Sequence, residues 1–293
     1  VAAGAAHNGI TTSTLGVGVD YHLGLMSHVA ECGNGEFHHV AQLDDLEGIL
    51  AGEFLEASAA TARNVEVTMN VAAAVAVGSN LNRLRQADIA DGVRVSLGDM
   101  VRGRDFLIEL TTPVEMAGNH LDVRVLVEGL GADGLIEARH SLKIALVSAD
   151  EEAVLPVDES IVARVAVGLQ MQADMDTSLA AEDGDLDAAA NALTSLRSSA
   201  VQLSAAYGAT VANSARLVGT VDYLDSLALR TQTPQSPRVL KSRFDMAKMT
   251  SRGRAQLIGP CPVCGEHAFF EGEKGGRVLR NCTACGHMER PDR

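Results

Sequence analysis

Four of the five cysteines in this 293-residue chain stand close together near its C-terminal end. Cys261 and Cys264 form one Cys-x-x-Cys pair, Cys282 and Cys285 form a second, and 17 residues separate the pairs. A Cys-x-x-Cys turn directs both sulfurs to one centre, and four thiolates complete the closed tetrahedral shell of a structural zinc ion. The spacing therefore predicts a zinc ribbon over residues 258–290, with these four cysteines as the ligands of one structural Zn²⁺.

Other residues of this segment support the zinc prediction or offer alternatives to it. A glycine follows each pair, where it permits a left-handed turn, and the residues between the pairs suit a hairpin. Two disulfides are the alternative reading of the same four cysteines, and His267 and His287 are alternative ligands. Because four cysteines already fill the shell, no position is left open for a substrate, and we expect no catalysis at this centre.

Other residues with reactive side chains give weaker signals. Cys32 follows His28 by one helical turn, but no third group or oxyanion motif accompanies the pair, so a small residue at a helix end is the preferred reading. Five histidines lie within the first 39 residues and are expected at the surface (His7, His22, His28, His38 and His39). Gly16-Val17-Gly18 lacks the remaining residues of a phosphate-binding loop. We therefore predict that the chain is not an enzyme.

Composition and charge narrow the class of protein. The chain is 46% hydrophobic and 21% charged, which is typical of a globular protein, and its net charge is −14. Residues 238–293 differ, with eleven Lys or Arg against six acids. The acidic remainder argues against nucleic-acid binding by the main domains, and the basic tail leaves it open there. No apolar run approaches the roughly 20 residues of a membrane span, and metal thiolates favour a reducing cytoplasm.

The first 57 residues alternate between strand and helix patterns. We predict strands over Ile10–Val17 and Glu36–Val40, with a helix over Tyr21–Glu31 between them. Asp20 is expected to cap that helix, and Asp44 to cap a second helix that ends near Ala57. This order implies a parallel sheet with crossover helices.

The order of residues in this segment also resembles a known family. Gly9-Ile10, Thr14-Leu15-Gly16-Val17-Gly18, Asp20-Tyr21, Ala30 and Gly33-x-Gly35-x-Phe37 are similar to the last part of a von Willebrand factor type A (VWA) domain, in particular in the bacterial calcium-activated-chloride-channel-like group. The resemblance implies capture of a protein partner through Mg²⁺. The family's Asp-x-Ser-x-Ser loop occurs nowhere in this chain. We therefore expect no Mg²⁺-dependent site here.

The small size of this segment has a physical consequence. Two strands and two helices make a small core, so we read residues 1–57 as the C-terminal part of a VWA domain, N-terminally truncated, whose first part was lost or is encoded elsewhere. The chain begins with Val rather than Met, which fits a fragment or a processed start. The strand Ile10–Val17 would then stand at an open sheet edge, and we expect some self-association through it.

The remaining residues divide by pattern. Residues 62–150 carry short alternating strands broken by turn residues, which predict an antiparallel β-sandwich. Such a domain follows the VWA domain in the group named above. Residues 157–230 are rich in Ala and Leu and predict two or three helices, with Asp158 and Asp185 as caps. Residues 231–256 hold two prolines and six basic residues, and we expect a mobile basic linker.

The sequence thus predicts a multidomain protein of α/β and all-β parts: half of a doubly wound VWA sheet, a sandwich, a helical segment and a zinc ribbon. The predicted function is non-enzymatic protein interaction or scaffolding in the cytoplasm, with a partner that the sequence does not identify. The alternative is nucleic-acid binding through residues 238–293, by the zinc ribbon and the basic linker.

Overall fold

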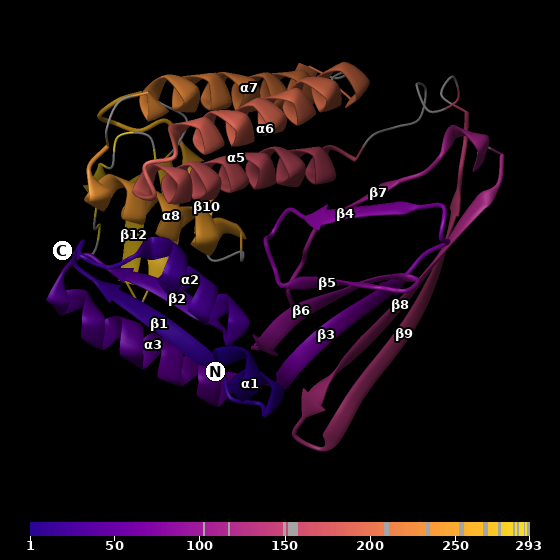
Figure 1. The fold of residues 1–293 in the computed structure, drawn as a ribbon, viewed down its shortest axis with the longest axis horizontal. Coiled ribbons are helices and arrows are strands. Elements are labelled where there is room, and N and C mark those ends of the chain that lie inside the picture. Colours follow the sequence, from indigo (N-terminus) through magenta and orange to yellow (C-terminus); the bar gives the residue numbers. More distant parts are fainter. Residues whose placement is uncertain are drawn as a thin grey trace. The chain divides into compact units, whose positions relative to one another are not determined.

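Figure 1 shows the fold of the chain in a computed structural model. The structure describes residues 1–101, 103–116, 118–148, 151, 158–207, 211–232, 235–251, 255–265, 269–274, 277–283, 285, 287–289 and 291. The chain divides into two compact units, which are described separately. The first contains Val1–Thr12, Ala30–Gly35 and Leu55–Pro156, and the second contains Ser13–Val29, Glu36–Phe54 and Val157–Arg293.

The N-terminal segment has the predicted order of strands and helices. After α1 (Ala2–His7) come β1 (Thr12–Val17), α2 (Leu23–Cys32), β2 (Asn34–Val40), the short 3-10 helix η1 (Leu43–Asp45) and α3 (Leu46–Ala59). β1 and β2 pair in a two-stranded sheet. The N–H of Thr12 donates to Gly33 O at 2.9 Å, and the N–H of Gly18 donates to Val40 O at 3.1 Å. Both strands therefore run in the same direction, with α2 as the crossover.

The two helices in this segment begin differently from the prediction. α2 begins at Leu23, three residues after Asp20, and its first N–H groups are bound by a carboxylate from far along the chain, that of Glu182. Asp44 lies inside η1, whose N-cap residue is Gln42. A local acid precedes each helix in the sequence. However, α2 begins later, where Glu182 binds its first N–H groups, and α3 begins after the additional 3-10 turn η1.

The first unit is built mainly from antiparallel strands. They are β3 (Ala62–Asn70), β4 (Ala76–Asn80), β5 (Gln86–Ile89), β6 (Gly92–Met100), β7 (Ile108–Thr111), β8 (His120–Gly131) and β9 (Gly134–Ala145), with the 3-10 helix η2 (Val114–Met116). Five strands form one sheet in the order β5-β6-β3-β8-β9, and β4 pairs with β7. The alternating pattern predicts strands over Asn64–Val71, Val93–Leu97, Asp105–Thr111, Asp122–Val127 and Arg139–Val147. It does not predict β4 or β5, because Gly78-Ser79-Asn80 is typical of a turn and Gln86–Ile89 has little alternation.

One face of the five-stranded sheet carries the core of this unit. Val65, Val67 and Met69 of β3 lie beside Val93 and Val95 of β6, each at most 9% exposed. The paired strands β4 and β7 contribute Val77, Ile108 and Leu110, which pack against the same cluster. The alternating apolar residues of the central strands thus face one shared interior, as the period of two predicts.

Three long helices open the C-terminal part of the second unit. They are α5 (Glu159–Glu182), α6 (Leu186–Tyr207) and α7 (Val211–Thr231), in agreement with the predicted two or three helices. Asp158 caps α5 by accepting from Ser160 N at 2.8 Å, and Asp185 caps α6 by accepting from Ala188 N at 2.9 Å. Among the described residues, no helix combines the length and apolarity that a membrane crossing requires.

The predicted linker at residues 231–256 is wrong. Its central part is the helix α8 (Pro237–Ser251), and every residue from Leu240 to Met249 is buried. Phe244 stacks edge-on against Phe37 of β2 at 5.9 Å, and the Lys248 ammonium donates to Ser27 Oγ of α2 at 2.8 Å. The charges that suggested a solvated tether are thus held by partners inside the unit.

The chain ends in a small antiparallel sheet. Its strands are β10 (Ala255–Gly259), β11 (Phe269–Lys274), β12 (Arg277–Cys282) and β13 (Met288–Glu289), in sequential order. β11 and β12 form a hairpin that pairs Lys274 with Arg277 next to its tip and Phe269 with Cys282 at its base. The hairpin expected between the two cysteine pairs is therefore present, and its base carries one of the four cysteines.

Candidate metal centre

The first cysteine pair occupies the turn after β10. The N–H of Gly265 donates to Cys261 O at 2.9 Å, and Gly265 has a φ of +75°, the left-handed conformation that glycine adopts without strain. The N–H of Val263 points at Cys261 Sγ, 3.4 Å away. The turn thereby brings both cysteines of the pair to one side, with Cys261 buried and Cys264 exposed.

The second pair occupies the end of β12. Cys282 is held by the ladder to β11 and by its N–H, which donates to His287 O at 2.8 Å. The N–H of Cys285 points at Cys282 Sγ at 3.4 Å, so in both turns a backbone N–H faces the sulfur of the first cysteine. Here too the first cysteine is buried and the second is exposed. The two turns are therefore similar in form and face one another.

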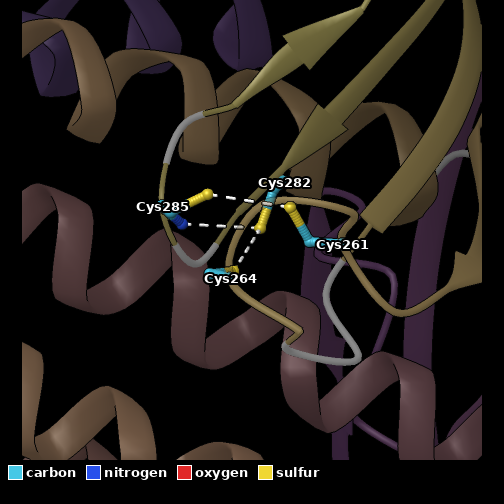
Figure 2. Close-up of side chains that lie close together, drawn as sticks. All are labelled: Cys261, Cys264, Cys282 and Cys285. Carbon is cyan, nitrogen blue, oxygen red and sulfur yellow. Dashed lines mark hydrogen bonds between the residues drawn. The ribbon is translucent and has the colours of Figure 1, made fainter.

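The four sulfurs converge in space (Figure 2). Cys261 Sγ lies 3.8 Å from Cys285 Sγ, and Cys264 Sγ lies 3.6 Å from Cys282 Sγ. All four ligand atoms lie within 4.8 Å of one another. A tetrahedron with Zn–S bonds of about 2.3 Å has edges of about 3.8 Å, whereas a disulfide bond is only about 2.05 Å long. The arrangement matches a four-thiolate metal shell and not a pair of disulfides.

The electrostatics of the cluster also favour a cation. Burial alone would raise the pKa of Cys261, but the N–H groups of Cys264 and Val263 favour its thiolate and lower the pKa to about 7. Burial raises the pKa of Cys285, and its neighbouring thiols Cys264 and Cys261 raise it further. Four thiolates at these separations repel one another strongly, so only a bound metal ion allows all four to ionise together.

A buried polar network holds the second turn against the helices of its unit. The side chain of Arg243 on α8 is 1% exposed, and its Nε donates to Thr283 O at 2.8 Å. The same Nε lies 3.7 Å from Asp174 Oδ1 on α5. Tyr223 of α7 donates to Asp174 Oδ1 at 2.5 Å and lies 3.1 Å from Thr283 Oγ1. Helices α7 and α8 thus contact Thr283, one of the two residues between Cys282 and Cys285, and α5 joins them through Asp174.

This network contains the most strongly buried acid near the centre. Asp174 is fully buried, and burial raises its pKa to about 6, although the Arg243 cation and the Tyr223 hydroxyl favour its ionised form. A second contact supports the same turn, because Asn281 Nδ2 donates to Ser242 O of α8 at 3.3 Å. None of these contacts was predicted, because they join residues that are far apart in the sequence.

The other residues considered from the sequence are placed differently. His287 stacks on Phe269 with ring centroids 6.0 Å apart, and its Nε2 lies 3.1 Å from Glu289 Oε1, which makes it a neighbour of the cluster. His267 lies outside the described residues. Cys32 is half-buried at the end of α2.

The expectation that the early histidines lie at the surface is wrong for two of them. His38 and His39 are 7% and 6% exposed. Their partners explain their burial, because His38 Nε2 lies 2.8 Å from Glu53 Oε1 and His39 Nδ1 lies 2.8 Å from the Tyr21 hydroxyl. Both histidines lie within β2, and the sequence pattern alone gave no signal for these partners.

A second group of ligand-type side chains was also missed by the sequence. His22 Nδ1 lies 3.3 Å from Glu182 Oε2, and His22 Nε2 lies 3.3 Å from Asp183 Oδ1. The oxygens of Glu182 already accept hydrogen bonds, one from Leu23 N at 2.7 Å and one from the Lys241 ammonium at 2.9 Å. The exposed imidazole and the occupied carboxylate make this an ion-pair cluster that starts α2.

The similarity of this chain to known proteins is a similarity of fold. No protein-family profile matches the chain, and no curated protein matches it. Among solved structures, the chain is similar to the von Willebrand factor type A protein from Catenulispora acidiphila, with 12% sequence identity and a TM-score of 0.50. The similarity covers 92% of this chain and 55% of that protein, so the chain spans about half of its length. At this identity the likeness concerns the fold alone, and the chain has a VWA-like fold.

Proposed function

We propose that this protein is a non-enzymatic protein-interaction scaffold of the VWA type, stabilised by one structural Zn²⁺ on Cys261, Cys264, Cys282 and Cys285. The observation that carries the proposal is the VWA-like fold combined with a closed four-sulfur cluster. VWA-like folds are often used to bind other proteins. A four-thiolate shell leaves no position for a substrate, so the metal serves folding rather than chemistry.

Zinc is the metal that fits these ligands best. Tetrahedral sulfur shells suit zinc or iron, and zinc needs no redox partner and tolerates the shape imposed by the protein. The buried side of the cluster is formed by Cys261 and Cys282, at 2% and 0% exposure. A metal there joins the ends of β10 and β12, which supports a role in holding the ribbon together.

The domain organisation belongs to the same proposal. Residues 1–57 act as the C-terminal part of a VWA domain of the bacterial calcium-activated-chloride-channel-like group, and residues 62–150 act as its β-sandwich. The parallel pair β1–β2 with α2 and α3 supports the first assignment. The packing of Val77, Ile108 and Leu110 on the five-stranded sheet supports the second. Without an Asp-x-Ser-x-Ser loop, partner binding does not use Mg²⁺.

Nucleic-acid binding through residues 238–293 is less well supported. Lys241, Arg243 and Lys248 are 3%, 1% and 5% exposed, so their charges are not presented to a phosphate backbone. Lys241 pairs with Glu182, and Arg243 faces Asp174. Electrostatic binding of nucleic acid needs accessible cations that can displace counterions. These three of the eleven basic residues of the segment therefore serve the interior of the unit.

Binding measurements separate the two functions. The zinc-loaded full chain is immobilised, and proteins cross-linked to it in cytoplasmic extract are identified before and after nuclease treatment, at 50 and 500 mM salt, with and without added Mg²⁺. The proposal expects a defined protein set that withstands nuclease and salt and does not depend on Mg²⁺.

The alternative has a distinct signature. Under the scaffold proposal, fluorescence anisotropy with short labelled DNA and RNA should show no binding tighter than the ordinary non-specific level, a Kd of about 10⁻⁴–10⁻⁶ M at physiological salt. Tight nucleic-acid binding that falls steeply with salt, together with an empty protein set after nuclease treatment, contradicts the scaffold proposal and supports the alternative.

A further inference from the structure

The edge strand β9 combines three features that rarely occur together. It is twelve residues long, all twelve are exposed, and within the described part of the chain it pairs only with β8. Its pairing with β8 shows no bulge or register shift, and it contains no proline. Proteins usually shorten, bulge or cover such an edge, because its free N–H and C=O groups invite another strand. The opposite edge of the same sheet, β5, has only four residues.

One face of β9 is apolar and continues the core face of its sheet. Ile144 is paired with Leu121 and Leu142 with Val123, and directly opposed residues lie on the same face. Leu121 and Val123 are each 2% exposed, whereas Ile144 and Leu142 are 41% and 44% exposed. The apolar face of the sheet therefore extends to β9 and stops there without cover from the described residues. An additional strand alongside β9 would bury this apolar strip.

The sequence of β9 is complementary to itself in one antiparallel register. With His140 facing His140 of a second copy, Glu137 faces Lys143, Ile136 faces Ile144 and Ala138 faces Leu142. Each pair occurs twice because of the two-fold symmetry. Opposite charges and apolar pairs that face each other across strands both stabilise a sheet. Lys143 has no ion pair with any residue that the structure describes, although Asp122 lies opposite it on β8. Glu137 accepts from Arg139 Nε at 2.6 Å within its own strand, so a facing Lys143 would add a second cation to this carboxylate.

Neighbouring registers are less favourable. A slip of one residue along the pairing puts the apolar side chains of one copy on the polar face of the other. A slip of two residues in one direction sets Arg139 against Lys143, and in the other direction it sets Leu135 against Lys143. The register centred on His140 is therefore selected by both charge and hydrophobicity.

We propose that β9 is a homodimer interface, at which two copies of this chain join their five-stranded sheets antiparallel about His140. The kind of partner follows from the strand itself, because a second copy supplies the charges and apolar side chains that β9 faces. The inference concerns the first unit and is independent of the metal centre.

Charge reversal and rescue test the interface. Sedimentation velocity of the zinc-loaded full chain over a range of concentrations should show a monomer–dimer equilibrium. Lys143→Glu, which places glutamates opposite one another at both pairs, should raise the dimer Kd about tenfold or more. The double variant Glu137→Lys/Lys143→Glu recreates both opposite pairs and should return the Kd to within about threefold of the original. Asp88→Lys, at the β5 edge, is the matched control and should leave the Kd unchanged.

Cross-linking tests the register. Cα atoms in a non-hydrogen-bonded antiparallel pair lie about 4.5 Å apart, within reach of a disulfide. His140→Cys should therefore form a disulfide-linked dimer under mild oxidation, whereas Leu135→Cys, roughly 33 Å from its own copy in this register, should not.

Two results overturn the proposal. One is a monomer at every concentration, and the other is a dimer whose Kd is unchanged by Lys143→Glu, which would point to another edge such as Ile10–Val17. Circular dichroism of each variant shows whether it is folded. If Lys143→Glu does not fold, the dimer Kd of the double variant still tests the proposal.

Discussion

At the scale of single residues, a small set of buried polar groups explains how the second cysteine turn is held. Arg243 donates to the backbone of Thr283, and its charge faces Asp174, which also binds Tyr223. Removing one partner of a buried ion pair leaves the other charge uncompensated, which typically destabilises the folded state by about 3–5 kcal/mol. Arg243 and Asp174 therefore support the metal centre from positions about 40 and 110 residues away from it in the sequence.

The raised pKa of Asp174 predicts a specific pH dependence of stability. Its pKa rises from 3.8 to about 6 on folding, so the folded state binds this proton more tightly than the unfolded state. The stabilisation from this group is therefore present below about pH 4 and is lost as pH rises to about 6. The free energy of unfolding of the native chain minus that of Asp174→Asn should fall by up to about 3 kcal/mol across this window.

Urea titrations of both proteins at several pH values check this prediction. Loss of metal at the acid end affects both proteins and cancels in the difference. A difference that stays flat, or that rises with pH, would mean that Asp174 is not a buried acid with a raised pKa. Asp176→Asn, on the same helix, is a suitable control, since Asp176 is not among the fully buried residues.

At the scale of elements, α8 shows why sequence patterns misjudge a buried polar helix. Its composition is polar, and prolines and basic residues surround it, which is typical of a linker. Lys241, Arg243 and Lys248 are nevertheless buried, because Glu182, Asp174 and Ser27 receive them. A hydrophobicity pattern predicts that charged side chains are exposed. It contains no information on the partners elsewhere in the chain that allow these side chains to be buried.

The burial of α8 predicts resistance to trypsin. The peptide bonds after Lys241, Arg243 and Lys248 should survive limited digestion for as long as the chain is folded, since cleavage requires local unfolding of a buried helix. Mass spectrometry of the early fragments checks this outcome. The same digestion in urea should cut all three sites, which shows that they are intrinsically cleavable. Early fragments that end at these residues would restore the linker interpretation.

The start of α2 gives a second prediction at this scale. Glu182 accepts from Leu23 N at 2.7 Å and Gly24 N at 3.2 Å, and it pairs with the buried Lys241. Glu182→Ala removes a helix cap and the partner of a buried cation, so it should destabilise the chain by about 2–4 kcal/mol.

The neighbour of Glu182 provides the control. Asp183 is 58% exposed. Asp183→Ala should therefore lower the free energy of unfolding by less than about 0.5 kcal/mol. Chemical denaturation measures both. Equal effects of the two substitutions would show that the carboxylate of Glu182 has no special role. The sequence suggested Asp20 for this role, and only the fold reveals that the cap comes from α5.

At the scale of the whole molecule, the features encoded locally were predicted and those encoded by long-range contacts were not. The cysteine spacing predicted the cluster, because each Cys-x-x-Cys turn is a local structure and the two turns share one hairpin. The alternation of β3, β6, β8 and β9 predicted most of the antiparallel sheets. The motif around Gly16 predicted the VWA-like fold, and it has a physical basis, since a side chain at Gly16 would collide with the ring of Tyr21.

What the sequence missed depends on partners far away in the chain. The short strand β4 contains the turn-like Gly78-Ser79-Asn80, and its Val77 packs against the sheet core, whereas β5 is held by its pairing with β6. The burial of His38 and His39 depends on Glu53 and Tyr21 in the same way. Within each unit, local patterns therefore specify the elements, and buried polar pairs specify how they assemble.

The metal content of the purified chain tests the central claim most directly. Protein prepared under reducing conditions should contain about one zinc per chain by elemental analysis, held by four thiolates. Cys264→Ser should lose most of that zinc, because three sulfurs no longer complete the shell, whereas Cys32→Ser should keep it. Native protein without zinc, with iron in its place, or with zinc that depends on Cys32 rather than Cys264 would contradict the structural zinc centre.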